Sequence, residues 1–195
     1  EAQYSLGVSY ENGFGVDQDY EEAVKYYQLA ADQGLADAQL NLGVFYANGL
    51  IVDQDYEEAV KYFQLAADQG DAEAQYYLGV SYERGLGIEQ DYEEAVKYYQ
   101  LAADQEMAEA QYNLGNCYLN GLGVDQDYEE AVRYYRLAAD QGDAYAQYNL
   151  GWCYYSGEGV EQDYEEAIKY IRLSAEQGYP DAQCQLGYMY EYGQG

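Results

Sequence analysis

The chain has 195 residues and is strongly acidic, because 37 aspartates and glutamates stand against 8 lysines and arginines, for a formal net charge of −29. Such a charge repels the phosphates of nucleic acids and of anionic lipid headgroups, so we expect neither nucleic-acid binding nor membrane insertion. No apolar run approaches the ~20 residues of a membrane span, and no secretory leader is recognisable.

One short stretch recurs along the chain. QDYEEAVKY stands at residues 18–26, returns at 54–62 and 90–98, and returns with one change each at 126–134 and 162–170. Its tyrosine falls at positions 20, 56, 92, 128 and 164, so the period is 36 residues. A fixed period of roughly 20–50 residues is typical of a solenoid or a propeller. We therefore expect a single domain over residues 1–195, with about five and a half repeats that start near 1, 37, 73, 109, 145 and 181.

The first helix of each repeat, helix A, is clearest in residues 71–84. Asp71 is a suitable N-cap, and the position after it is occupied in the last repeat by Pro180, which is tolerated only at the start of a helix. Helix A should run to about Arg84. Gly85 and Gly87 then interrupt the pattern and predict a short loop.

The second helix, helix B, should begin after Asp91, with Glu94 completing a capping box, and run towards Gln105. The turn after helix B should be left-handed, because it carries a glycine in most repeats. Glu106 is the exception. A side chain in that conformation costs about 1–2 kcal/mol, so this turn is either strained or differently shaped. The glycines at this position are Gly34, Gly70, Gly142 and Gly178.

The carboxylates of the recurring stretch have two interpretations. In the first, Asp19 caps helix B, Glu22 closes the capping box, and Glu21 pairs with Lys25 four residues later. In the second, DQDYEE binds Ca²⁺, but it lacks the glycine and the distant glutamate of an EF-hand loop. We favour capping, and we expect no metal and no cofactor. The basic residues expected to be exposed partners of Glu21 and its equivalents are Lys25, Lys61, Lys97, Arg133 and Lys169.

Three cysteines are present: Cys117, Cys153 and Cys184. An odd number cannot all pair within the chain, and the first two occupy equivalent places in neighbouring repeats. Packed helices lie about 8–10 Å apart, whereas a disulfide needs Cα atoms within about 7 Å. We therefore expect free thiols, which mildly favour a reducing compartment. The sequence leaves the localisation otherwise open.

Units such as AEAQYYLGVSYERGLGIEQDYEEAVKYYQLAADQ, residues 72–105, resemble Sel-1-like repeats, which are relatives of the tetratricopeptide repeat. The resemblance covers the whole chain, with Ile51 in place of the second loop glycine and Glu106 in place of the helix-ending glycine as the departures. It implies an all-α fold, a right-handed α/α superhelical solenoid of helix-turn-helix repeats. It also implies a role as an adaptor or scaffold that binds proteins. Cysteine-rich bacterial relatives have been linked to β-lactam binding, but their paired cysteine pattern is missing here.

Helix A has one constant face. Five of its positions keep the same residue in all six copies, and on a helical wheel they lie together, which indicates a packing face. A second constant feature lies on helix B, where a tyrosine recurs at positions 26, 62, 98, 134 and 170; we expect this ladder to be core rather than a platform for sugars. In the third repeat the constant residues of helix A are Ala74, Gln75, Leu78, Gly79 and Tyr82.

The opposite face of helix A changes from repeat to repeat, and asparagines, aromatic residues and an arginine occur on it. In helical solenoids such a face lines a concave surface that binds extended ligands, although an unselected solvent face would also drift. Trp152, the single tryptophan, is the candidate anchor, unless it packs against the next repeat. The candidate protein-binding residues are Asn41, Val44, Asn48, Tyr77, Val80, Arg84, Asn113, Asn116, Asn120, Tyr145, Asn149, Trp152, Ser156, Tyr188 and Tyr192.

The leading hypothesis for function is a non-enzymatic scaffold or adaptor that binds a protein or peptide of basic or aromatic character in the helix A groove. The alternatives are a saccharide-binding module and a structural repeat with no ligand of its own. An enzyme is disfavoured, because the chain has no histidine, and we expect no carboxylate to depart from the repeat pattern. The end repeats lack polar caps, so we expect either that the chain is a fragment of a longer array or that its ends stack on a partner, which includes end-to-end self-association.

Overall fold

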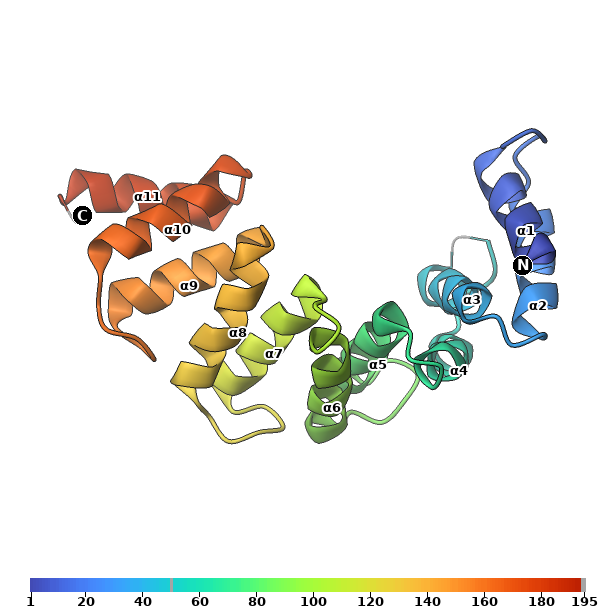
Figure 1. Ribbon diagram of the computed structural model, residues 1–195, viewed down its shortest axis with the longest axis horizontal. Helices are drawn as coiled ribbons and strands as arrows, with labels where there is room; N and C mark the ends of the chain where they lie inside the picture. Colours follow the sequence, from blue (N-terminus) through green and yellow to red (C-terminus); the bar gives the residue numbers. More distant parts are fainter. Residues whose placement is uncertain (50, 194–195) are drawn as a thin grey trace. The chain divides into compact units, whose positions relative to one another are not determined.

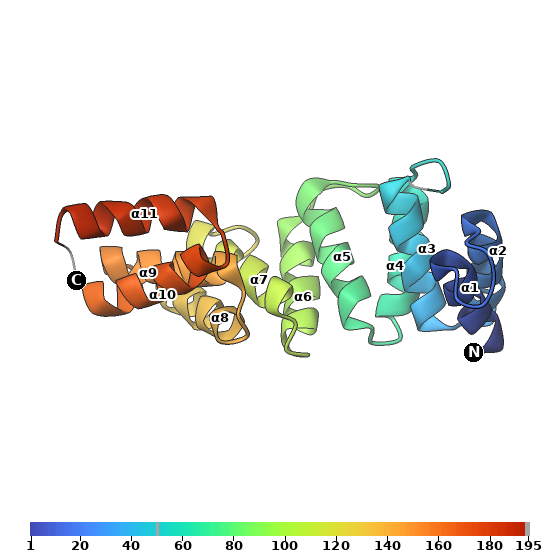
Figure 2. The same ribbon diagram turned by 90° about the horizontal axis from the view of Figure 1, so that it is seen from above.

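The structure, a computed structural model, describes residues 1–49 and 51–193. Within these ranges the regular secondary structure consists of helices joined by loops, without strands. This confirms the predicted all-α class. Helices A and B alternate along the chain, and consecutive helices pack against each other within residues 2–84 and within residues 108–191 (Figures 1 and 2). The helices are α1 (Ala2–Asn12), α2 (Tyr20–Ala31), α3 (Ala36–Asn48), α4 (Tyr56–Ala67), α5 (Ala72–Arg84), α6 (Tyr92–Ala103), α7 (Ala108–Asn120), α8 (Tyr128–Asp140), α9 (Ala144–Ser156), α10 (Tyr164–Glu176) and α11 (Pro180–Glu191).

The chain divides into two compact units, residues 1–98 and 99–195, each with its own core. In unit 1 the core includes Tyr27 and Phe63, and in unit 2 it includes Tyr135 and Ile171. These side chains project from helix B against the small constant residues of helix A. Gly115 lies so close to the Tyr135 ring that a Cβ there would sit 2.7 Å from it. No helix in the described ranges is both long and apolar enough to span a membrane.

Aspartate side chains start every helix B, as predicted. The Oδ1 atom of Asp127 accepts hydrogen bonds from the backbone N–H groups of Glu129 (3.0 Å) and Glu130 (3.1 Å). The predicted capping box is wrong in its second bond, in which the glutamate side chain would accept from the backbone N–H of the capping aspartate. The backbone N–H of Asp127 donates instead to the carbonyl oxygen of Tyr118 at 2.9 Å. The preceding helix A thus satisfies the donor that the glutamate was expected to satisfy. The same bond forms at Asp19, Asp55, Asp91 and Asp163.

The predicted ion pair on helix B is also wrong in its register. Lys25 pairs with Glu22 at 2.6 Å rather than with Glu21, so the pair is three residues apart instead of four. Both spacings bring side chains together on a helix, and Glu22 is available because it is not used in a capping box. The partners of Lys61, Lys97, Arg133 and Lys169 are likewise Glu58, Glu94, Glu130 and Glu166.

The turn after helix B is left-handed in every complete repeat, including the one without glycine. Glu106 has φ of 66°, in the same left-handed region as the glycines at the same place, whose φ values run from 84° to 95°. Its N–H donates to the Ala103 carbonyl oxygen at 3.0 Å, as that of Gly70 does to Ala67 at 2.9 Å. Of the two alternatives left open by the sequence, the strained turn is therefore the correct one. Its energetic cost is of the order of 1–2 kcal/mol.

The tyrosine ladder, predicted to be core, is only partly so, because Tyr134 is buried while Tyr26, Tyr62, Tyr98 and Tyr170 are half-buried. In each repeat the tyrosine of helix B stacks on the constant tyrosine of helix A, as Tyr134 does on Tyr118 with ring centroids 5.6 Å apart and planes 9° apart. The Tyr134 hydroxyl also donates to Gln100 Oε1 of the preceding repeat at 2.7 Å. The predicted absence of disulfides is confirmed, because the three cysteines are unbridged, with Cys117 and Cys153 buried and Cys184 exposed.

Candidate functional site

The predicted binding residues separate into two groups by burial. The exposed group offers side chains to solvent, while the half-buried group faces the interior of its own unit. The exposed residues are Asn48 and Arg84 in unit 1 and Asn120, Tyr145, Trp152, Ser156, Tyr188 and Tyr192 in unit 2. The half-buried residues are Asn41, Val44, Tyr77 and Val80 in unit 1 and Asn113, Asn116 and Asn149 in unit 2.

Several half-buried residues support the core. The Tyr135 hydroxyl donates to Asn116 Oδ1 at 2.7 Å, and Asn149 lies in the same hydrogen-bonded cluster, with its Nδ2 3.4 Å from that oxygen. In unit 1, Tyr77 stacks on Phe63 with ring centroids 4.9 Å apart and planes 14° apart. Burial raises the pKa of Tyr135, so its phenol stays a hydrogen-bond donor.

A signal for these supporting roles is present in the sequence but was missed. The large core residue of helix B and the helix A residue fourteen positions later change together. A tyrosine is followed by an asparagine, which can hydrogen-bond its hydroxyl, and the phenylalanine is followed by an aromatic residue, which can stack on it. Part of the variation on helix A therefore compensates for the core. The pairs are Tyr27 and Asn41, Phe63 and Tyr77, Tyr99 and Asn113, Tyr135 and Asn149, and Ile171 and Gln185.

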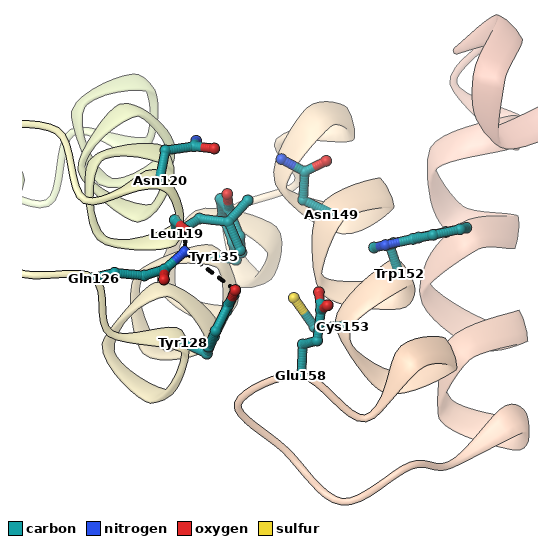
Figure 3. A pocket seen from close by; sticks show the side chains of 9 residues that line it. All are labelled: Leu119, Asn120, Gln126, Tyr128, Tyr135, Asn149, Trp152, Cys153 and Glu158. Carbon is teal, nitrogen blue, oxygen red and sulfur yellow. Dashed lines mark hydrogen bonds between the residues drawn. The ribbon is translucent and has the colours of Figure 1, made fainter.

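Two residues of the exposed group, Asn120 and Trp152, line a cavity in unit 2, which we call the Trp152 pocket (Figure 3). The pocket has a volume of about 220 Å³ and lies between the end of α7, the start of α8 and the face of α9. Trp152 is 41% exposed, and one face of its ring stacks on Tyr155 at 5.4 Å. The predicted residues Asn120 and Asn149 line the pocket with it; the full lining is Leu119, Asn120, Gln126, Tyr128, Tyr135, Asn149, Trp152, Cys153 and Glu158.

Glu158 is the one acidic residue that lines the pocket, and it corrects our expectation that no carboxylate departs from the repeat pattern. The equivalent residues of the first four repeats are apolar: Phe14, Leu50, Leu86 and Leu122. Leu50 lies outside the described residues. Figure 3 shows the Glu158 carboxylate rising from the loop after α9, between Tyr128 and Trp152. Among the described residues, no hydrogen bond or ion pair engages this carboxylate.

The loop that carries Glu158 is held against α8 by a close backbone approach. Gly159 has φ of 70°, and a Cβ there would lie 2.1 Å from the carbonyl oxygen of Tyr128. Only glycine fits both conditions. On the other side of the pocket, Gln126 donates to the Tyr128 hydroxyl at 3.1 Å and to the Leu119 carbonyl oxygen at 2.7 Å. The walls of the pocket are thus fixed by backbone contacts and by neutral hydrogen bonds.

The chemistry of the pocket suits binding rather than nucleophilic attack. Burial, followed by the nearby negative charge of Glu158, raises the pKa of the Cys153 thiol to about 12. A thiol with that pKa is protonated at neutral pH and is a poor nucleophile. Across the described ranges, no three potential metal ligands among cysteine, aspartate and glutamate gather closely enough to hold an ion.

An equivalent hollow occurs in unit 1, which we call the Phe45 pocket. Glu11, Tyr20, Phe45 and Ile51 line it, and its volume is about 290 Å³. Tyr20 and Phe45 occupy the same repeat positions as Tyr128 and Cys153. The Glu11 carboxylate accepts a hydrogen bond from the buried Tyr27 hydroxyl, so it is already engaged within the unit.

These features define a helical-repeat protein with an exposed polar and aromatic face on helix A. The Sel1 repeat model matches residues 1–35, 36–71, 72–107, 108–143, 144–179 and 180–195, and the chain therefore belongs to the Sel1 repeat family. Proteins of this family are generally non-catalytic scaffolds for protein interactions. The predicted resemblance is thereby confirmed. Comparison with curated proteins gave no match.

Solved structures extend this assignment. A protective antigen present in uropathogenic Escherichia coli strains, c5321, which displays an SLR fold, is 44% identical with a TM-score of 0.93 over 98% of this chain. The chain spans 41% of the length of that protein. A Sel1 repeat protein from Oxalobacter formigenes is 36% identical with a TM-score of 0.92, and the match covers 99% of this chain and 77% of that one. Immunity protein PA5088 from Pseudomonas aeruginosa is 25% identical with a TM-score of 0.57, covering 93% of this chain and 66% of that one.

Proposed function

We propose that the chain is a non-enzymatic interaction module that binds a peptide or protein segment on the concave face of its A helices. The observation that carries this proposal is Trp152, a 41% exposed aromatic residue beside a polar cavity. Tryptophan is strongly enriched among residues that dominate binding energy at interfaces, and it is uncommon on an idle surface. The asparagines around it can adapt their hydrogen bonds to an extended backbone.

The net charge of −29 supports a partner of basic character, because opposite charges steer the encounter. Such steering should weaken as salt screens the charges, over a Debye length of about 8 Å at physiological ionic strength. The backbone of an extended segment would also hydrogen-bond the asparagine side chains along this face. The proposal therefore names a class of ligand: an extended peptide that carries positive charge.

The test is selection of a random peptide library on the immobilised chain, followed by titration of enriched peptides against two variants. Trp152→Ala removes the proposed anchor, and Leu137→Ala removes an equally exposed apolar residue from helix B, since both side chains are 41% exposed. We expect affinity to fall by about tenfold or more in the first variant and to stay within about twofold in the second. No enrichment, or equal losses in both variants, would contradict the proposal.

A further inference from the structure

The Trp152 pocket carries a negative charge without a positive partner. Of its nine lining residues, Glu158 alone is acidic and none is basic. The remaining polar groups are neutral amides and hydroxyls, which include Asn120, Asn149 and Tyr128. A carboxylate next to a cavity of this kind favours a cation supplied from outside the chain.

We infer that the Trp152 pocket binds an arginine side chain of the protein partner, with Glu158 as the residue that pairs with the guanidinium group. This inference rests on the proposed protein-binding function and deepens it, because it names the side chain that the partner must present. The site adds two residues, Glu158 and Tyr128, to those predicted from helix A.

Two departures from the repeat pattern meet at this cavity. Glu158 replaces the apolar loop residue found in the first four repeats, and Trp152 replaces the valine that stands at positions 8, 44 and 80. Both changes place larger or more polar groups beside the same hollow. Leu122 shows that an apolar residue is compatible with the equivalent loop in the preceding repeat. Packing alone therefore gives no reason for a carboxylate at position 158.

The size of the pocket restricts its occupant. A volume of about 220 Å³ is below the ~300–1,000 Å³ of pockets that enclose whole small molecules. One side chain is a better match for it than a complete metabolite. The pocket opens beside the exposed face of helix A, so an extended peptide lying there could place a side chain inside it.

The chemistry of the lining favours arginine over lysine. A guanidinium group is planar and presents five N–H donors, so it can bind a carboxylate with two parallel hydrogen bonds and still donate to neighbouring oxygens. The pocket offers such oxygens on Tyr128 and on the amides of Asn120 and Asn149. Guanidinium also packs on aromatic rings, and Tyr128 and Trp152 stand on either side of Glu158 (Figure 3). An ammonium group is more strongly hydrated and would use fewer of these partners.

The single tryptophan makes the test direct, because intrinsic tryptophan fluorescence reports on Trp152 alone. The probe is a flexible glycine-serine peptide with one central arginine, titrated beside the same peptide with citrulline or lysine. Citrulline keeps the shape of arginine and removes its charge. We expect a saturable change with the arginine peptide, and binding weaker by about tenfold or more with citrulline and by several-fold with lysine.

The variants make the assignment specific. Glu158→Leu introduces the residue that three other repeats carry at this loop position, so the fold should be retained. Glu161→Gln removes one negative charge from the same loop at a residue that does not line the pocket. We expect affinity for the arginine peptide to fall about tenfold or more in Glu158→Leu and to stay within about twofold in Glu161→Gln. Circular dichroism of both variants verifies that the helices are intact.

The outcomes separate this inference from the proposed function. No arginine-dependent fluorescence change, equal binding of the citrulline or lysine peptide, or equal losses in the two variants would overturn the arginine site. If peptides from the library still bind in a Trp152-dependent way, the protein-binding role stands while the inference fails. If neither the probe nor the library gives Trp152-dependent binding, both fail.

Discussion

The Phe45 pocket of unit 1 and the Trp152 pocket of unit 2 occupy the same place in their repeats, and both contain a carboxylate. In unit 1 the carboxylate belongs to Glu11 on helix A and accepts a hydrogen bond from the buried Tyr27 hydroxyl. In unit 2 the corresponding hydroxyl, on Tyr135, donates to Asn116 instead, and the carboxylate of Glu158 comes from the loop. The equivalent pockets therefore hold carboxylates from different repeat positions: Glu11 is engaged within unit 1, and Glu158 makes no hydrogen bond or ion pair with the described residues of unit 2.

The two units differ in which residue accepts the hydrogen bond of the buried phenol, which is Glu11 in unit 1 and Asn116 in unit 2. A neutral side chain can therefore do in one repeat what a carboxylate does in another. The loop itself is also different, since Ile51 of unit 1 stands where Gly159 of unit 2 approaches the preceding helix B. Three predictions test this difference between the units.

The largest effect is expected when the loop of unit 2 is given a side chain, as the loop of unit 1 has at Ile51. Gly159→Ala should lower the free energy of unfolding by roughly 2–4 kcal/mol, the sum of backbone strain and a clash with the Tyr128 carbonyl oxygen. Urea denaturation followed by circular dichroism measures this change. Trp152 fluorescence in the folded variant shows whether the loop has left the pocket.

A matched control separates the clash from the strain. Gly178 also has a positive φ, of 92°, but a Cβ there would meet nothing within 4 Å. Gly178→Ala should therefore cost only the conformational part, about 1–2 kcal/mol. Equal costs at positions 159 and 178 would show that the loop is not held by its contact with Tyr128.

The second prediction concerns Asn116, which accepts the hydrogen bond of the buried Tyr135 hydroxyl. Asn116→Val introduces the valine that other repeats carry and leaves the fully buried Tyr135 hydroxyl without its acceptor. We expect a loss of about 1–3 kcal/mol in the free energy of unfolding. Thermal and urea denaturation provide the measurement.

A double variant provides the control for this hydrogen bond. Adding Tyr135→Phe to Asn116→Val removes the buried hydroxyl as well, so most of the lost stability should return. A double variant as unstable as the sum of the single variants would mean that the two residues are energetically independent. The hydrogen bond between Tyr135 and Asn116 would then not be the counterpart of the bond between Tyr27 and Glu11 in unit 1.

The sequence predicted the elements well because their signals are local. The aspartate that caps helix B and the glycine that ends it each act within one turn of their own helix, and both are found where predicted. The errors concern groups with competing partners. A glutamate can reach a lysine three or four residues away, and the N–H of Asp127 is satisfied by Tyr118 of the preceding helix, a tertiary contact that local sequence rules do not include.

The candidate site was only partly predictable for a related reason. Variation between repeats selected Trp152 correctly as an exposed residue, but it also selected Asn149 and Tyr77, whose changes follow the core residues Tyr135 and Phe63. Glu158 lies in the loop after helix A rather than on the variable face of that helix, and the same loop position is apolar in the first four repeats. Comparing all positions of the repeat, loops included, would have identified it.

The smallest effect is expected at the turn after helix B, where unit 1 has Gly70 and unit 2 has Glu106 in the same left-handed conformation. Glu106→Gly should raise the free energy of unfolding by about 0.5–1 kcal/mol, because relief of the strain exceeds the entropy that glycine loses on folding. The reverse change at another turn of unit 2, Gly142→Ala, should be destabilising, since φ there is 95° and a Cβ would meet no other atom within 4 Å. Urea denaturation of the two variants beside the parent measures both signs. A destabilised Glu106→Gly variant would mean that the Glu106 side chain contributes more to the fold than its backbone strain costs, and that this turn, like the loop at Glu158, differs between the units for a reason other than drift.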